Sequence, residues 1–310
     1  MRVRQPGRVQ RKLWFLGHED TSVYLLEGNE ESMIVSGGMS YLAPDILRQF
    51  EAFGIDEGRI KKLLILHAHY DHVGIVPFFK RRHPDLEIYA SARAWEILRM
   101  PKAINTINEF SRGDAKDRGM EGAYKKWDLD WTDDITGKTI SDGDIIDLGN
   151  LEVCIFETPG HSSCSISAYA PSIKALFASD AVGIPYKDTI IIYGNSNFTR
   201  FQQSLGKLKA LDVEYVCADH FGYITGEEAG DFILQSINVA RQHRTLIEKV
   251  YLRTGDIETT VQEMVSAFLK ENPDFIMTLE IFEGVYRQMV RHIANALEDS
   301  SNPANCKKKE

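Results

Sequence analysis

The sequence predicts a layered α/β fold followed by a helical C-terminal region, and three observations support this class. In the first half of the chain, short β-rich runs alternate with segments whose apolar residues recur at helical spacing. Predicted strands end in a histidine or an aspartate at four places, namely residues 67–72, 161, 180 and 220. From about residue 225 the pattern is helical. In α/β folds, catalytic and ligand-binding residues commonly lie at the ends of strands in this way.

The first predicted strands form a hairpin. Residues 21–27 (TSVYLLE) and 32–36 (SMIVS) are β-rich and flank a turn at 28–31. A helix follows at 43–53, because a proline suits its start and a glycine its end. The remaining elements of this half are a strand at 63–66, a helix at 73–82, a strand at 87–90 and a helix at 92–100.

The strand at 63–66 stops abruptly in His67-Ala68-His69-Tyr70-Asp71-His72. His67 and His69 are two positions apart, so an extended backbone points both imidazoles to the same side. Asp71 and His72 follow where the chain turns into the next helix and reach the same hollow from another direction. Histidines can also cap helices or fill cores, but three imidazoles and a carboxylate at this spacing indicate a metal site.

The second half of the chain supplies further residues of the same kinds. A strand pair at 139–148 and 151–157 ends in Thr158-Pro159-Gly160-His161-Ser162. Strands at 165–169 and 175–178 lead to Asp180, and a strand at 213–218 leads to Asp219-His220. The other histidines are interpreted as surface or packing residues: His18, His83, His243 and His292.

Two helical blocks accompany this α/β pattern. The polar stretch 101–131 is predicted to be a helical insertion in a core of residues 1–228, either a charged surface helix or a lid over a site. Helices at 225–252, 256–270 and 278–297 make up most of a helical region at 229–300, which could cover a sheet edge, line a pocket or pair two chains. Residues 301–310 have the composition of a disordered tail.

Composition limits the classes of partner. The chain of 310 residues is 43% hydrophobic and 26% charged, which is ordinary for a globular protein. A formal net charge of −9 argues against nucleic acid or an anionic membrane as the principal partner, and we expect a small-molecule substrate instead. With no signal peptide pattern and no CxxC pair among four cysteines, a cytoplasmic protein with reduced thiols is predicted, and a homodimer is left open.

The ligand-type residues resemble those of the metallo-β-lactamase superfamily over roughly residues 13–225. HAHYDH matches its HxHxDH signature, TPGHS its next histidine element, and Asp180 and His220 its last two elements. The resemblance implies an αββα sandwich of two mixed sheets flanked by helices, here with a C-terminal helical extension. It also implies two metal sites that share Asp180, one held by His67, His69 and His161 and the other by Asp71, His72 and His220.

This resemblance implies a dinuclear metal-dependent hydrolase acting on an ester or thioester, with a phosphodiester as a further option. Zn is the default ion, and Fe or Mn suits the same ligands. The two ions would activate a bridging water, and Asp71 is the candidate catalytic residue that orients it and carries its proton. Aromatic residues near the ligands are candidates for substrate binding, with an ordinary core role as the alternative: Tyr70, Tyr193, Phe198 and Phe221.

Within the superfamily, the IVSGG segment, the helical excursion and the helical C-terminus resemble PqsE, the quinolone signal response protein, and thioesterase-like or glyoxalase II-like members. Lactonases carry a tyrosine where this chain has Gly183, and flavodiiron members carry a glutamate where it has His69, so both branches are disfavoured. Two alternatives to a hydrolase follow from the resemblance. One is a PqsE-like signalling or partner-binding protein with incidental hydrolysis, and the other is a mononuclear iron persulfide dioxygenase, which a complete second site disfavours.

The chain departs from the usual pattern at three positions near the ligands. Ser36 stands where many members have an aspartate at the end of the hairpin, and Ser179 replaces the glycine before the bridging aspartate. Asp219 stands in place of the glycine before the last histidine. We therefore expect the hydrogen bonds that hold the ligands to be altered.

Overall fold

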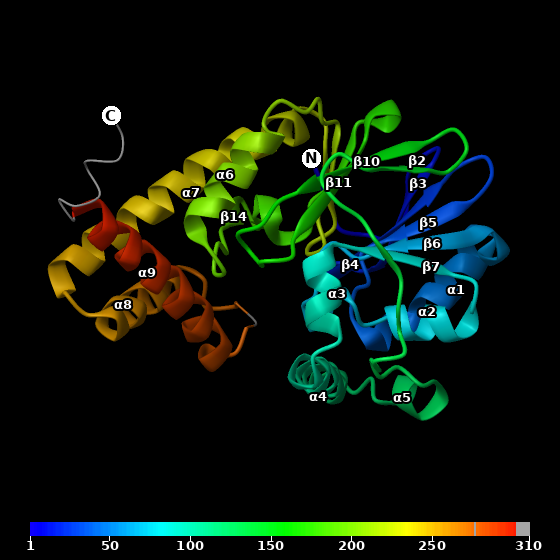
Figure 1. The fold of residues 1–310 in the computed structure, drawn as a ribbon, viewed down its shortest axis with the longest axis horizontal. Coiled ribbons are helices and arrows are strands. Elements are labelled where there is room, and N and C mark those ends of the chain that lie inside the picture. Colours follow the sequence, from blue (N-terminus) through cyan, green and yellow to red (C-terminus); the bar gives the residue numbers. More distant parts are fainter. Residues whose placement is uncertain (276, 302–310) are drawn as a thin grey trace.

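The computed structural model of the protein describes residues 1–275 and 277–301 (Figure 1). In this part of the chain the strands form two seven-stranded sheets and one two-stranded sheet. The two large sheets lie face to face, and helices cover their outer faces (Figure 1). The predicted αββα sandwich is therefore confirmed.

The first large sheet contains the predicted hairpin and the strand that leads to the histidines. Tyr24 pairs with Val35 across the hairpin, and the strands after it run parallel to one another. In sheet order the strands are β2 (Gly7–Gln10), β3 (Leu13–His18), β4 (Thr21–Glu27), β5 (Ser32–Val35), β6 (Ile60–Leu64), β7 (Glu87–Ala90) and β8 (Lys138–Thr139). The helices on its outer side are α1 (Ala43–Phe53), α2 (Val76–Arg82) and α3 (Ala92–Leu98).

The second large sheet begins with the N-terminus of the chain, because Arg2 pairs with Ile224. In sheet order its strands are β1 (Arg2–Val3), β16 (Tyr223–Thr225), β15 (Tyr215–Cys217), β12 (Ala175–Phe177), β11 (Ile166–Ala170), β10 (Glu152–Glu157) and β9 (Ile145–Asp147). The predicted continuous strand at 139–148 is wrong. A turn at residues 141–144 divides it, so that β8 joins the first sheet and β9 the second.

Alternating side chains of β4 pack into two different hydrophobic clusters. Tyr24 and Leu26 point between the sheets, where they belong to a fully buried cluster that also contains Phe177 of β12. Val23 and Leu25 point outward and join the cluster under α1 and α2. Because both faces of this strand are covered, it reads as a continuous apolar run rather than an alternating one.

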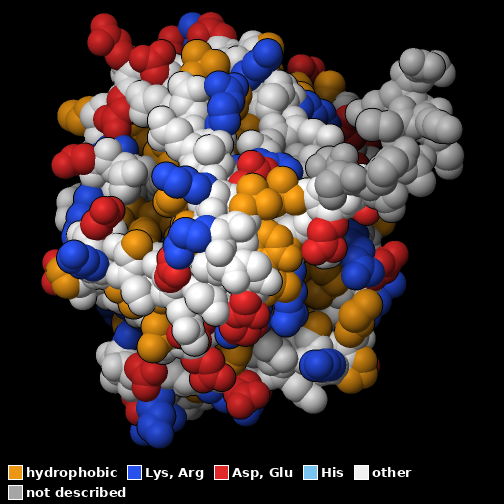
Figure 2. All heavy atoms as spheres, turned by 90° about the vertical axis from the view of Figure 1, so that its left-hand side faces the viewer, with side chains coloured by type: hydrophobic (Ala, Val, Ile, Leu, Met, Phe, Trp, Pro, Cys, Tyr) orange, Lys and Arg blue, Asp and Glu red, His pale blue; other side chains and the backbone are white. Residues whose placement is uncertain are grey.

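The outer face of the second sheet is covered by α6 (Phe198–Leu208) and α7 (Glu227–Thr254), and α8 (Ile257–Glu271) and α9 (Leu279–Ser301) pack on these. The three predicted C-terminal helices are thus present and share one buried cluster with α6. The helix predicted to begin at residue 225 begins at Glu227 instead, because Thr225 ends β16 and Gly226, with a φ of 73°, precedes the helix. On the face of the molecule shown in Figure 2, acidic and basic side chains are interspersed with hydrophobic ones.

The excursion after α3 is helical, as predicted, and consists of α4 (Pro101–Asp117) and α5 (Gly122–Lys126). Ile107 and Ala115 of α4 are buried in the cluster of the first sheet. None of the helices in the described ranges is both long and apolar enough to cross a membrane. Of the predicted tail at 301–310, Ser301 ends α9 and the rest lies outside the described residues.

Several strands and one helix of the structure were not predicted from the sequence. They are the strands β1 to β3 near the N-terminus, the short hairpin of β13 (Ile184–Tyr186) and β14 (Thr189–Ile191), the helix α6, and the strand β16. The N-cap of α6 is Asn197, whose side chain accepts a hydrogen bond from the Arg200 backbone N–H.

Candidate metal centre

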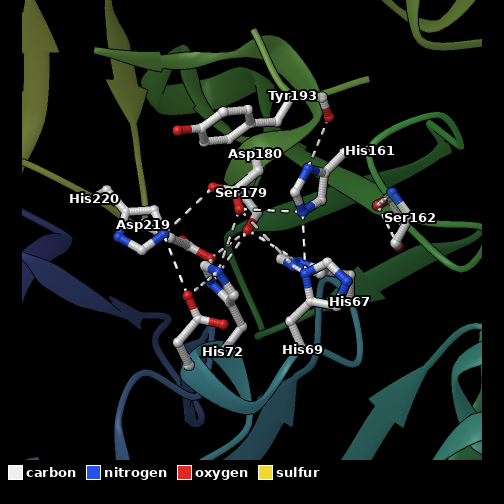
Figure 3. A network of polar contacts seen from close by, with 12 residues as sticks. His67, His69, His72, His161, Ser162, Ser179, Asp180, Tyr193, Asp219 and His220 are labelled. Atoms are coloured by element: carbon white, nitrogen blue, oxygen red, sulfur yellow. Dashed lines mark hydrogen bonds and ion pairs between the residues drawn. The ribbon is translucent and has the colours of Figure 1, made fainter. Parts of the chain in front are cut away.

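The loops that carry the predicted ligands converge at one edge of the sandwich. They follow β6, β10, β12 and β15, and Figure 3 shows the histidine rings and the Asp180 carboxylate pointing toward one another. The turn that carries His161 is held tightly against α6. Gly160 has a φ of 144°, and a Cβ there would lie 2.3 Å from the backbone of Phe201. Only glycine allows this approach, which fixes the position of the next residue, His161.

The first cluster consists of His67, His69 and His161. His67 Nε2 and His161 Nε2 each lie 3.1 Å from His69 Nδ1. Ligand atoms arranged tetrahedrally around an ion at about 2.0–2.1 Å lie about 3.3–3.4 Å apart. The three nitrogens therefore have nearly the spacing that one bound ion requires.

The second cluster consists of Asp71, His72 and His220. His72 Nε2 lies 3.2 Å from Asp71 Oδ2, and His220 Nε2 lies 3.6 Å from the same oxygen. Asp180 stands between the clusters, since its Oδ2 is 3.2 Å from His161 Nε2 and 3.4 Å from His72 Nε2, while its Oδ1 is 3.7 Å from His220 Nε2. The seven residues predicted from sequence are thus brought together in one place.

In four of the five histidines, all but His69, the other ring nitrogen contacts a protein oxygen. His161 Nδ1 donates to the Tyr193 backbone oxygen at 2.9 Å, and His220 Nδ1 donates to that of Asp20 at 2.8 Å. Donation from Nδ1 leaves the Nε2 lone pair free to bind a metal. In the described part of the chain, His72 Nε2 and Asp180 Oδ1 are buried without a hydrogen-bond partner. Buried polar atoms are rarely left unpaired, so these residues fit a metal ion.

The pKa values of His67 and His69 in the first cluster are shifted in the opposite direction to that of His72 in the second. Burial lowers the pKa of His67 well below its usual value and that of His69 to about 4, so both rings are neutral and able to bind a cation. Burial opposes a charge on His72 as well, but Asp71 and Asp180 raise its pKa well above the usual value. Burial also disfavours the Asp180 carboxylate, yet His72 and His220 hold its pKa well below the usual range. Asp71 and Asp180 thus place two carboxylates beside His72, and a divalent ion would neutralise them in place of the proton on that ring.

A family model described as "Metallo-beta-lactamase superfamily" matches residues 16–220, which is more than half of the chain. The chain belongs to the metallo-beta-lactamase superfamily.

Relatives within this superfamily are distant. The acyl-coenzyme A thioesterase MBLAC2 of Homo sapiens is 24% identical over 184 residues, covering 56% of this chain and 62% of that protein. The hydroxyacylglutathione hydrolase of Bradyrhizobium sp. (strain ORS 278) is 28% identical over 140 residues, covering 45% of this chain and 40% of that protein. The matches thus span less than two thirds of the length of either relative.

Solved structures agree on the fold. A metallo-beta-lactamase family protein from Thermus thermophilus superposes with a TM-score of 0.66 at 17% identity, covering 94% of this chain and 95% of that one. At this identity the similarity shows the fold alone.

The three residues that depart from the superfamily pattern lie together, because Ser36 and Ser179 both contact the buried carboxylate of Asp219. Asp219, which is 2% exposed, accepts hydrogen bonds at its Oδ2 from His72 Nδ1 at 2.8 Å, Ser36 Oγ at 2.8 Å and Ser179 Oγ at 2.5 Å. Because the Ser179 proton is directed to Asp219, its oxygen is free to accept from His67 Nδ1 at 3.2 Å. In this chain the carboxylate that contacts His72 Nδ1 thus comes from position 219.

The predicted substrate-binding aromatics lie in different surroundings. Tyr193 is closest to the expectation, because its buried hydroxyl has no hydrogen-bond partner among the described residues and its ring lies beside Asp180 (Figure 3). Tyr70 donates to Asp114 of α4 at 2.9 Å, and Phe221 lines a separate cavity with Arg4. Phe198 is the first residue of α6 and is fully buried and stacked on His243, which agrees with the ordinary core role given as the alternative.

A cavity of about 440 Å³ lies beside the first cluster, and part of its wall was missed by sequence reasoning. His69 and His161 form one side, while Gln288, Arg291 and His292 of α9 form another. His292 had been interpreted as a surface or packing residue. The spacing of these three residues does place them on one face of a helix, but the sequence does not reveal that this face is turned toward the histidines.

Proposed function

We propose that the protein is a metal-dependent hydrolase that uses two divalent ions to cleave an ester or thioester. One observation carries the proposal: two clusters of ligand atoms lie on either side of a shared, buried carboxylate, Asp180. His67, His69 and His161 would hold one ion, and Asp71, His72 and His220 the other. Zn is the default, while Fe and Mn accept the same imidazole and carboxylate ligands.

The bound ions would supply Lewis acidity, which makes water nucleophilic at neutral pH and polarises the substrate carbonyl. The protein supplies position and proton transfer. Although burial disfavours the charge on Asp71, the neighbouring His72 and His220 lower the pKa of its carboxyl far below the usual value. Asp71 is therefore ionised at neutral pH and can orient the attacking water and accept its proton. The products are a carboxylic acid and, for a thioester, a thiol.

A thioester is the preferred substrate class in this proposal. The two relatives described above carry the names acyl-coenzyme A thioesterase and hydroxyacylglutathione hydrolase, and both names denote cleavage of a thioester. Tyr193 is the candidate substrate contact, because its buried hydroxyl has no hydrogen-bond partner among the described residues and can donate to an acceptor.

We also propose that the two helical blocks restrict access to the metals. Residues of α9 line the cavity that contains His69 and His161. From the other block, Asp114 of α4 holds Tyr70 next to Asp71, and Tyr70 packs at 5.3 Å from the Phe110 ring. Limiting water around the ions strengthens the electrostatic interactions that the reaction needs.

The test begins with metal analysis of the purified, reconstituted protein, for which we expect about two transition ions per chain. His69→Ala should then abolish hydrolysis of a thioester probe, while His83→Ala, a histidine paired with Glu57 outside the centre, should not. Fewer than one ion per chain, or unchanged turnover by His69→Ala, would contradict the proposal.

The same preparation distinguishes the alternatives. Efficient binding of metal without turnover on thioester, ester or phosphodiester probes would favour a signalling or partner-binding role. Oxygen consumption with glutathione persulfide would favour the dioxygenase.

A further inference from the structure

The residues that line the cavity beside the first cluster differ in charge from the chain as a whole. The chain contains 45 acidic and 36 basic residues, yet none of the residues lining the cavity is an aspartate or a glutamate. The wall contributed by α9 carries Arg291 and His292. In an acidic protein, a concave wall with a guanidinium and without carboxylates attracts anions locally.

Arg291 is available for a ligand. Among the residues with described side chains, it has no carboxylate within the 4.0 Å that defines an ion pair, and its side chain is exposed. Glu258 of α8 interacts with its charge only from beyond that distance. Arg287, one helical turn earlier, does form an ion pair, since its Nε lies 2.7 Å from Glu258 Oε1 of α8. The two arginines thus differ in their surroundings: one is paired across the helical region and the other lines the cavity.

We propose that this cavity is a subsite for an anionic group of the substrate, a carboxylate or a phosphate, which Arg291 binds. The inference rests on the proposed hydrolase function and adds the charge of the substrate to it. Arg291 is suited to the task because its planar guanidinium forms two parallel hydrogen bonds with either anion. Gln288 and His292 beside it offer further polar groups on the same wall.

The position of the cavity determines what the anion would do. The cavity is also lined by His69 and His161, so a molecule held by Arg291 within this space lies beside the first cluster. Its volume is toward the lower end of the range for ligand pockets, which is about 300–1,000 Å³. Binding of the anion would therefore fix the carrier relative to the first cluster and orient the thioester for attack.

The experiment compares thioesters that share an acyl group and differ in the charge of the carrier. Glutathione thioesters carry carboxylates, coenzyme A thioesters carry phosphates, and N-acetylcysteamine thioesters are neutral. Loss of a charge-assisted pair should raise the KM of Arg291→Gln about 10- to 100-fold for an anionic substrate and leave kcat nearly unchanged. The neutral thioester should show no such rise. Arg291→Lys should retain part of the binding, and Arg287→Gln on the same helix serves as the matched control.

A binding measurement makes the result independent of turnover. Calorimetric titration of the metal-loaded protein with free glutathione or coenzyme A should give binding that Arg291→Glu abolishes and that weakens with added salt. Preference for glutathione would identify a carboxylate, and preference for coenzyme A a phosphate. If the neutral thioester is hydrolysed and the Arg291 variants act on all three substrates like the parent, the subsite is refuted while the hydrolase stands. If no thioester is hydrolysed but Arg291-dependent binding is found, the proposed function fails and the anion site stands.

Discussion

Replacing Asp219 by asparagine should weaken metal binding without removing a ligand. The carboxylate is buried and accepts hydrogen bonds at one oxygen from His72 Nδ1, Ser36 Oγ and Ser179 Oγ. Asparagine has a similar shape, and its carbonyl can still accept from His72, but it lacks the negative charge that makes the ring a stronger ligand. Its amide group would take the place of Oδ1, which is buried without a hydrogen-bond partner among the described residues, so the substitution leaves two buried donors unpaired.

The magnitude follows from the number of ligands that depend on this carboxylate. Removing one such supporting partner costs about 10- to 100-fold in metal affinity, or about 1.4–2.8 kcal/mol. His72 contacts Asp219 directly and belongs to the second cluster, whereas His67 reaches it only through Ser179. We therefore expect the full loss at the second site and a smaller loss at the first.

The assay is titration of chelator-treated protein with Zn²⁺ or Co²⁺ against a competing chelator, which resolves two binding steps. Asp212→Asn is the matched control, since Asp212 precedes β15 as Asp219 follows it, but its side chain is 75% exposed and pairs with Lys174. Affinity of the second step within about twofold of the parent would refute the argument, because it lies far below the expected 10-fold effect.

Two further predictions concern groups outside the ligand set. Burial lowers the pKa of His243 to about 4, so the folded state stays neutral while the unfolded chain takes up a proton below about pH 6.5. Stability should thus fall by up to about 3 kcal/mol from pH 6.5 to pH 4, and His243→Phe should reduce that slope in urea unfolding at matched metal content. An identical slope in the variant would contradict this assignment. Tyr70→Phe removes the 2.9 Å hydrogen bond to Asp114, and we expect a loss of about 0.5–1.5 kcal/mol together with faster hydrogen exchange in α4. Unchanged exchange would mean that packing of Ile107 and Ala115 holds this helix without that bond.

The sequence predicted elements well where local chemistry defines their limits. The helix at 43–53 agrees with the structure because a proline near its start and Gly54, which has a φ of 67°, bound it. The grouping of the first ligand-type residues was predictable for a related reason, since three histidines and an aspartate within six positions leave little freedom in how they point. In both cases the information lies within a few residues of the feature.

Elements that depend on distant partners were missed. The strand β1 is two residues long and exists because Arg2 pairs with Ile224, more than two hundred positions away. The division of the predicted strand at 139–148 has the same origin, because β8 and β9 pair with β7 and β10 in different sheets. The cationic wall of the cavity likewise depends on the orientation of α9, which no local pattern in the sequence specifies.

The carboxylate that contacts His72 belongs to Asp219, whereas many members of the superfamily have an aspartate at the position of Ser36. Ser36 and Asp219 follow β5 and β15, which belong to different sheets, and their side chains meet at 2.8 Å. A carboxylate from either strand end can thus reach the Nδ1 atom of His72, and what matters is its place in space rather than its place in the chain. If this is correct, a double variant with Ser36→Asp and Asp219→Ser should recover part of the metal affinity that Asp219→Ser alone loses. The backbone permits the change, because Ser36 has a φ of 68° and aspartate is among the residues that tolerate this left-handed conformation. A double variant that binds the second ion no better than Asp219→Ser would show instead that the position of the carboxylate in the chain does matter.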